Sequence, residues 1–377
     1  MAQFKQKFNK LIGRNGEPDI AMLVTVSIII LLGLIMLSSA SGTFAYSRFN
    51  DGYYFIKHQF LALLIGIGLF FYFSKTDYHI WKKYSIHLLI FSVVLLILVF
   101  IPGISSSANF KAQSWINIFG FSLQPSEFVK LTFLIYLAAW LEARNKKLES
   151  VSQGVGPFLA VLGVIAFLML MQPDFGTLSI IVITSLIAYF VGGGKVSHIF
   201  MIILAGIIAL FIMVQLKPYQ AERFRCFMDP SYNSAGTCYQ VNQSLIAVGS
   251  GGLWGRGFGA SRQKLMYLPE VSGDSIFPVI GEEMGFVFSS LLVILFLILF
   301  YRGYIIAKNS PDHFGQVLAI GIVSWITIQA IINIGGMINL MPMTGVPLPF
   351  ISSGGSAIMS ALAAVGILAN ISRQAKY

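Results

Sequence analysis

Ten apolar runs, each near the length of a membrane-spanning helix, constrain the fold of this chain more than any other feature. A helix that crosses a bilayer needs roughly 20 mostly apolar residues. Only 11% of the residues are charged, against about a quarter in an average soluble domain. The runs are residues 19–41, 57–74, 84–102, 126–142, 156–173, 176–192, 198–216, 276–300, 316–337 and 353–371. They predict an all-α, polytopic membrane protein with ten transmembrane helices, built as a single domain over residues 1–377.

The distribution of lysine and arginine predicts the orientation, because basic residues favour the cytoplasmic side of a membrane. Basic residues gather at both ends of the chain: Lys5, Lys7, Lys10 and Arg14 at the amino end, and Arg373 and Lys376 at the carboxyl end. Ten crossings would leave both termini in the cytoplasm. The net charge of +10 then has its origin in cytoplasmic segments, and we expect no nucleic-acid partner.

A polar interval at residues 217–275, between the seventh and eighth spans, is expected to form a large extracytoplasmic loop. Long loops cross a membrane largely regardless of their charge. The only two cysteines of the chain, Cys226 and Cys238, both fall in this loop. In an oxidising compartment they would form a disulfide, and on a side kept reduced they would stay free thiols.

Charged residues inside or beside the spans are costly and are therefore candidates for function. Glu127 and Lys130 lie three residues apart, on one helix face, as an ion pair of either structural or functional value. Glu282 and Glu283 enter the eighth span on different sides of the helix, and one of them is expected to bind Lys130 or a loop arginine. Asp174 is expected to cap the sixth span.

Three further features could act on a bound substrate or hold its anionic groups. Asp274 lies just before the eighth span, where a carboxylate can act as a general base, although a loop aspartate is more often a helix cap. Ser352 and Ser353 lie at the start of the tenth span and could bind an anion at a helix amino terminus. The glycines of residues 249–259 either let backbone amides approach a phosphate or only permit tight turns.

Taken together, the motifs resemble the SEDS family (shape, elongation, division and sporulation). The matching segments, in family order, are residues 124–130 (Gln-Pro-Ser-Glu with Lys130), 172–177 (Gln-Pro-Asp-Phe-Gly-Thr), 223–230, 239–247, 249–255, 263–270, 280–285 and 345–352. The sequence of residues 243–247 and 263–270 resembles the division-type branch (FtsW) more than the elongation-type branch (RodA).

The resemblance implies a peptidoglycan glycosyltransferase that polymerises lipid II at the outer face of the bacterial cytoplasmic (inner) membrane. It implies an inverting reaction with undecaprenyl pyrophosphate as the leaving group, in septal wall synthesis for the division type or in elongation and cell shape for the RodA type. The implied partners are a class B penicillin-binding transpeptidase and other divisome or elongasome membrane proteins.

The resemblance also assigns residue roles. Asp274 matches the essential loop aspartate of the family and is the expected catalytic base. The expected contacts to substrate are Arg223, Arg225, Lys264, Lys130, Gln243, Ser244, Ser352 and Ser353. The residues expected to orient these basic groups are Glu127, Glu282, Glu283 and Gln124. No metal-ligand spacing is present in the sequence, so a divalent cation (Mg²⁺ or Mn²⁺) would arrive with the substrate pyrophosphate.

The chain departs from the family pattern at three places. Ser272 and Gly273 replace the usual His-Thr pair before the aspartate, and Ser114 replaces the usual arginine before Trp115. Ser353 stands where the family usually has tyrosine.

Two other functions remain open from the sequence. A flippase for lipid II or another polyprenyl-linked sugar would share the anionic ligand, but such transporters often show repeated halves with a site near the midplane. A non-enzymatic divisome scaffold would not need Asp274.

Overall fold

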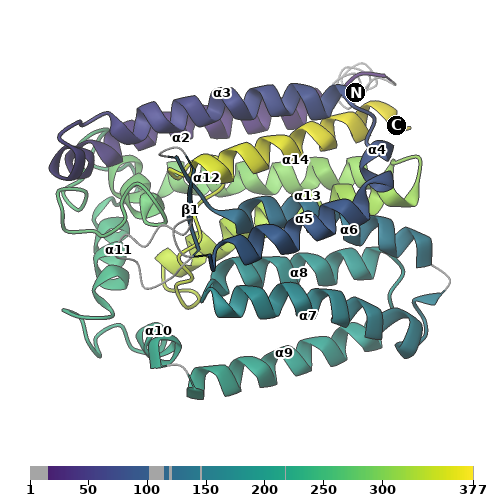
Figure 1. The fold of residues 1–377 in the computed structure, drawn as a ribbon. Helices are drawn as coiled ribbons and strands as arrows, with labels where there is room; N and C mark the ends of the chain where they lie inside the picture. The colour runs from purple at the N-terminus through teal and green to yellow at the C-terminus, as the bar shows by residue number, and fades with distance from the viewer. Residues whose placement is uncertain (1–15, 102–113, 119–120, 145–146, 217, 377) are drawn as a thin grey trace, which may run out of the picture.

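The computed structural model describes residues 16–101, 114–118, 121–144, 147–216 and 218–376, and these are helical over most of their length (Figure 1). A helix lies at each of the ten expected ranges. These helices are α2 (Ile20–Phe49), α3 (Tyr54–Lys75), α5 (Ser85–Leu98), α6 (Pro125–Arg144), α7 (Gly156–Met171), α8 (Phe175–Val191), α9 (Val196–Leu216), α12 (Ile276–Lys308), α13 (His313–Met337) and α14 (Gly355–Gln374). Among the described residues, six helices are long and apolar enough to cross a membrane by length and composition. The basic amino end lies outside the described residues.

Smaller elements connect these helices. They are α4 (His79–Lys83), the antiparallel strands β1 (Ile116–Ile118) and β2 (Phe121–Leu123), the π-helical turn η2 (Val151–Val155), α10 (Pro218–Met228) and α11 (Tyr239–Ser250). The two-stranded hairpin is a departure from the all-α expectation. The 217–275 interval, expected as a loop, contains α10 and α11.

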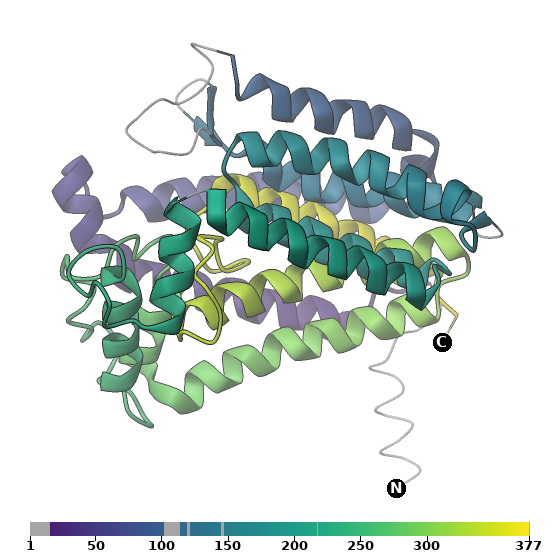
Figure 2. The same ribbon diagram turned by 90° about the horizontal axis from the view of Figure 1, so that it is seen from below.

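The long helices run side by side in one bundle with α13 and α14 at its centre (Figures 1 and 2). Helix α14 packs against α3, and α13 packs against α12, α8 and α6. The buried core includes Trp325 of α13 and Leu368 of α14. Helix α9 lies at the edge of the bundle, and its described side chains are mostly exposed, as at Ile207 and Phe211.

The two ends of the bundle differ in content. The described amino- and carboxyl-terminal residues lie together at one end, whereas α10, α11 and the α2–α3 turn lie at the other (Figure 1). At the end with the termini, Asp19 caps α2 through the Met22 amide and forms a buried ion pair with Arg302. The polar 218–275 segment is therefore gathered at the end opposite the termini.

Helix α12 is interrupted at Gly285, whose φ of 75° and ψ of −176° are not helical. The backbone of the preceding loop fills this interruption. The Arg256 and Gly257 amides donate to the Glu282 and Glu283 carbonyls, both at 3.0 Å, and the Phe286 and Val287 amides donate to the Gly252 and Leu253 carbonyls, at 2.9 and 3.2 Å. The loop thus satisfies helix groups that a continuous helix would pair internally.

Glycines make this close backbone approach possible. A Cβ atom on Gly255 would lie 2.1 Å from the Glu283 carbonyl oxygen, and one on Gly251 would lie 1.9 Å from the Gly281 oxygen. A Cβ atom on Gly285 would lie 2.2 Å from the Gly255 nitrogen. Of the two readings of the 249–259 segment, the structure gives these glycines a role in packing the loop against α12.

Candidate active site

Asp274 lies at the end of the bundle that carries α10 and α11, directly before the start of α12. Its side chain is partly buried. The amide nitrogen of Gln240, on α11, lies 3.3 Å from Asp274 Oδ1, and the Ser275 hydroxyl lies 3.4 Å from the same oxygen. Gln240 also donates to the Ser275 hydroxyl at 2.9 Å. Two neutral donors therefore orient one oxygen of the carboxylate.

Asn333, near the end of α13, holds the backbone of Asp274. Its Nδ2 donates to the Asp274 carbonyl and to the Val346 carbonyl, both at 2.8 Å. One buried amide thus joins α13, the start of α12 and the 342–350 segment.

Arg223, on α10, brings a positive charge to the same place. Its Nη1 donates to the Met343 carbonyl at 3.0 Å. A Cβ atom on Gly345 would lie 3.7 Å from both Arg223 Nη2 and Asp274 Oδ2. The guanidinium and the second carboxylate oxygen therefore both lie near Gly345, within the range at which the charge of Arg223 acts on Asp274.

The surroundings of Asp274 shift its proton affinity. Burial raises the pKa of Asp274 to about 6, and the nearby negative charge of Glu270 acts in the same direction. Arg223 and the hydrogen bonds from Ser275 and Gln240 oppose this rise. A carboxylate with a pKa near the operating pH is well matched to accept a proton from a hydroxyl.

Other expected substrate residues on α10 and α11 have partners within the protein. Arg225 Nη1 lies 3.3 Å from the Tyr232 hydroxyl, and its guanidinium lies over the Tyr232 ring. The Ser244 hydroxyl is buried, donates to the Gln240 carbonyl and faces Met337 of α13. Gln243 is partly buried on the same helix. The structure brings Arg223, and not Arg225 or Ser244, to Asp274.

The serines before α14 are engaged in the turn that contains them. The Leu348 amide donates to Ser352 Oγ at 2.8 Å, and the Ser353 amide donates to the Ser272 carbonyl at 2.7 Å. Gln59 Oε1 accepts from the Gly354 amide at 3.0 Å. These contacts join the 348–354 turn to the segment that precedes Asp274.

Lys264 forms a buried ion pair with Glu283, with 2.7 Å between Nζ and Oε1. Its ammonium also donates to the Ser39 hydroxyl of α2 at 2.8 Å. Glu282 accepts from the Ser261 hydroxyl at 2.6 Å and lies 3.7 Å from Arg256 Nη1. Arg256 is thus the loop arginine that was expected to pair with one of the two glutamates, and its partner is Glu282. The expected contact between Lys264 and the substrate stays a prediction.

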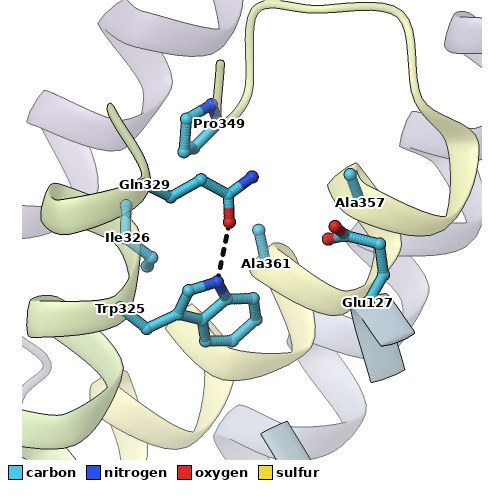
Figure 3. Close-up of a pocket in the computed structure, with 7 residues that line it drawn as sticks. All are labelled: Glu127, Trp325, Ile326, Gln329, Pro349, Ala357 and Ala361. Carbon is cyan, nitrogen blue, oxygen red and sulfur yellow. Dashed lines mark hydrogen bonds between the residues drawn. The ribbon is translucent and has the colours of Figure 1, made fainter. Parts of the chain in front are cut away.

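Glu127 and Lys130 form the expected ion pair, 2.8 Å apart and buried in the bundle. Lys130 Nζ also lies 2.6 Å from Gln329 Oε1 and 4.9 Å from the centre of the Trp325 ring. Glu127, Trp325 and Gln329 line a small cavity of about 10 Å³ together with Ile326, Pro349, Ala357 and Ala361 (Figure 3). That volume is close to the space for one water molecule.

Asp174 caps α8, as expected, by accepting from the Thr177 amide at 3.1 Å. Its other oxygen accepts from Gln124 Nε2 at 3.2 Å and from the Ser126 hydroxyl at 3.1 Å. Gln124 therefore orients Asp174 rather than a basic side chain.

Cys226 and Cys238 are joined by a disulfide. Among the described residues, no group of three or more His, Cys, Asp or Glu side chains could hold a metal ion.

Two residues at the site, Gln240 and Asn333, were not predicted from the sequence. Asn333 carried a usable signal, because a carboxamide within an apolar span is a functional candidate by default. The sequence signal for Gln240 was weaker. Gln240 lies in the polar segment 239–247, but only the folded chain shows which side-chain amide of this segment faces Asp274.

The chain matches the FtsW/RodA/SpoVE family, described as cell cycle proteins, over residues 19–377. It is 40% identical over 367 residues to stage V sporulation protein E of Bacillus subtilis (strain 168), covering 97% of this chain and 99% of that protein. It is 37% identical over 354 residues to a probable peptidoglycan glycosyltransferase FtsW of Geobacter sp. (strain M18), covering 94% and 96%.

Solved structures share the fold. A chain from a peptidoglycan synthase complex that coordinates polymerization and crosslinking matches with a TM-score of 0.77 and 26% identity, over 94% of this chain and 98% of that chain. The rod shape determining protein RodA of Thermus thermophilus matches in fold with a TM-score of 0.69 and 24% identity, over 96% and 98%. This chain is therefore a multi-pass membrane protein that belongs to the FtsW/RodA/SpoVE family, the SEDS family that its motifs resemble.

Proposed function

We propose that this protein is a peptidoglycan glycosyltransferase that polymerises lipid II into glycan strands, in the division type of cell-wall synthesis. Curated relatives at 35–37% identity carry the name probable peptidoglycan glycosyltransferase FtsW. The observation that carries the proposal is the carboxylate of Asp274, with a pKa raised to about 6, beside Arg223 at one end of the bundle.

In the proposed reaction, Asp274 accepts the proton of the 4-hydroxyl of an acceptor GlcNAc. That oxygen attacks the anomeric carbon of the donor MurNAc, and the bond to undecaprenyl pyrophosphate breaks with inversion. Gln240 and Ser275 hold Oδ1 by hydrogen bonds, so that Oδ2, on the side of Gly345, is the oxygen that receives the proton. Asn333 holds the backbone that carries this carboxylate.

The leaving pyrophosphate gains negative charge, and a fixed positive group stabilises that charge most where water is excluded. Arg223 is the basic side chain that the geometry favours for this role, because it is brought to Asp274 from a separate helix. The substrate contacts expected at Arg225, Lys264, Lys130, Gln243, Ser244, Ser352 and Ser353 stay predictions from the resemblance. Of these, Lys130 and Lys264 are held in buried ion pairs and Ser244 is buried against α13. Any divalent cation is proposed to arrive with the substrate pyrophosphate, in the manner of Mg²⁺ on phosphates.

The membrane arrangement follows from the same proposal. All ten long helices cross the cytoplasmic membrane, both termini lie in the cytoplasm, and the 217–275 segment with Asp274 faces outward. The separation of the described termini from α10 and α11, at opposite ends of the bundle, supports this orientation. The proposed partner is a class B penicillin-binding transpeptidase, in keeping with the synthase complex to which one structural match belongs.

The test is polymerisation of purified lipid II by the full chain, with and without the transpeptidase, compared with Asp274→Asn. We expect glycan strands from the native chain and a loss of at least about 100-fold in the variant, the scale of a missing general base. Asp51→Asn, the same isosteric change at a partly exposed aspartate of the α2–α3 turn, controls for damage that is not specific to Asp274.

Strands of equal yield from a folded Asp274→Asn protein would remove Asp274 as the base. No strands from the native chain with its partner present would point to the flippase or the scaffold. Transport of fluorescent lipid II in vesicles would then separate those two.

A further inference from the structure

The disulfide between Cys226 and Cys238 lies between the two helices that bring side chains to Asp274. Cys226 is on α10, three residues after Arg223, and Cys238 is the amino-terminal cap of α11, two residues before Gln240. Both cysteines are buried. One covalent bond therefore connects α10, which bears Arg223, with α11, which bears Gln240.

The two helices differ in how the bundle supports them. Helix α11 packs against α12 and α13 and buries Val241, Ser244 and Ala247. Helix α10 packs against α9, which is itself largely exposed along its described length. The firmly packed helix can therefore hold the other through the disulfide.

Hydrogen bonds between the described residues also hold α10 near the site. Arg223 itself donates to the Met343 carbonyl, and Asn339 Nδ2 donates to the Phe227 carbonyl at 3.2 Å. Between the helices, Asn242 Nδ2 donates to the Pro230 carbonyl at 2.8 Å. Hydrogen bonds between partly exposed side chains and carbonyls are weak constraints compared with a covalent link.

We propose that Cys226 and Cys238, joined as a disulfide, are positioning residues that keep Arg223 beside Asp274 for glycosyl transfer. The inference rests on the proposed function, because it assigns the bond a role only if Asp274 is the base. Opening the bond frees α10 to move with α9, and a displacement of Arg223 by about 1 Å can cost as much as about 100-fold in rate.

The bond also affects the proton affinity of Asp274. The charged groups that face Asp274 are Arg223 on α10 and Glu270 on the preceding loop, whereas α11 and α13 present the neutral amides of Gln240 and Asn333. Arg223 lowers the pKa of Asp274 and Glu270 raises it. If Arg223 moves away, the pH at which activity is half-maximal moves upward.

The experiment measures lipid II polymerisation by the full chain over a range of pH, before and after treatment with dithiothreitol. The dithiol reduces the disulfide to two thiols and is itself oxidised to a cyclic disulfide. The chain has only two cysteines, so the reagent has no other target in it. The double variant Cys226→Ala, Cys238→Ala controls for effects of the reagent on the partner and the assay.

We expect reduction to lower the rate about 10- to 100-fold and to raise the pH midpoint, with the double variant slow under both conditions. In an Arg223→Ala background, reduction should cost less than about 3-fold, since the side chain that the bond positions is gone. Thermal unfolding of each sample shows whether the fold persists.

Two results would overturn the inference. One is an unchanged rate and pH midpoint after complete reduction, checked by mass spectrometry of alkylated thiols. The other is an equal loss on reduction in the native and Arg223→Ala chains, which would indicate general destabilisation. A fully active Asp274→Asn chain in its oxidised state would instead contradict the proposed function, whatever the effect of reduction.

Discussion

The buried ion pair between Lys264 and Glu283 allows a test of whether Lys264 supports the fold or binds substrate. The side chain of Lys264 is 10% exposed, and that of Glu283 is fully buried. The Glu283 carboxylate accepts from Lys264 Nζ at 2.7 Å, from the Ser39 hydroxyl at 2.7 and 2.8 Å, and from the Gly259 and Ser261 amides at 3.0 and 3.4 Å. These contacts join the 259–264 loop to α2 and α12.

The two single substitutions should differ in cost. Glu283→Gln leaves the Lys264 ammonium buried without a countercharge, and removing one partner of a buried pair costs about 3–5 kcal/mol. Lys264→Met leaves Glu283 with its amide and hydroxyl donors, so we expect a smaller cost, about 1–3 kcal/mol. The double variant removes both charges and should be within about 1 kcal/mol of Lys264→Met.

The assay pairs thermal unfolding in detergent with lipid II polymerisation, and Arg262→Met, at an exposed basic position nearby, is the control. If Lys264 supports the fold, the double variant recovers stability relative to Glu283→Gln and polymerises within a few-fold of the native rate. A double variant that is stable but inactive would refute this reasoning and assign Lys264 to the substrate. Equal destabilisation by both single substitutions would contradict the expectation that Glu283→Gln costs more than Lys264→Met.

Two further predictions concern the active site and the loop that supports it. Because the pKa of Asp274 is raised to about 6, its carboxyl is mostly protonated below that pH. The polymerisation rate should therefore rise from pH 5 to pH 7. A rate independent of pH in this range would argue against Asp274 as the base. Gly255→Ala would place Cβ 2.1 Å from the Glu283 carbonyl oxygen at a φ of +81°, and should lower stability by more than about 2 kcal/mol. Gly259→Ala, at a φ of +80° with nothing within 4 Å of its Cβ, is the control matched in backbone conformation and should cost less than Gly255→Ala in the same thermal unfolding measurement.

The sequence was sufficient to predict the positions of the ten long helices and some local contacts, but not α10, α11 or the β1–β2 hairpin. Each apolar run became a helix, because a run of that length satisfies its own backbone groups only in that form. Asp174 and the Glu127–Lys130 pair form the contacts expected from their spacing, since partners three residues apart are set by helix geometry alone.

Contacts between distant segments were harder to predict. The pairing of Glu283 with Lys264 depends on how the 251–264 loop docks on α12, and no local spacing encodes it. Gln240 was missed for the same reason, since no local spacing relates it to Asp274. Asn333 was missed although its carboxamide within an apolar span was a usable signal. Gly285 did not reveal the break in α12, because a glycine within a span is tolerated in a continuous helix.

The exchange of backbone hydrogen bonds between residues 252–257 and residues 282–287 has a consequence for building chimeras of related proteins. A graft that replaced only the outer loop would set a foreign backbone against a helix whose amides and carbonyls need matching partners. The segment from Gly251 through Val287 is therefore the smallest unit that can be transplanted in this region, with its loop and its interrupted helix inherited together.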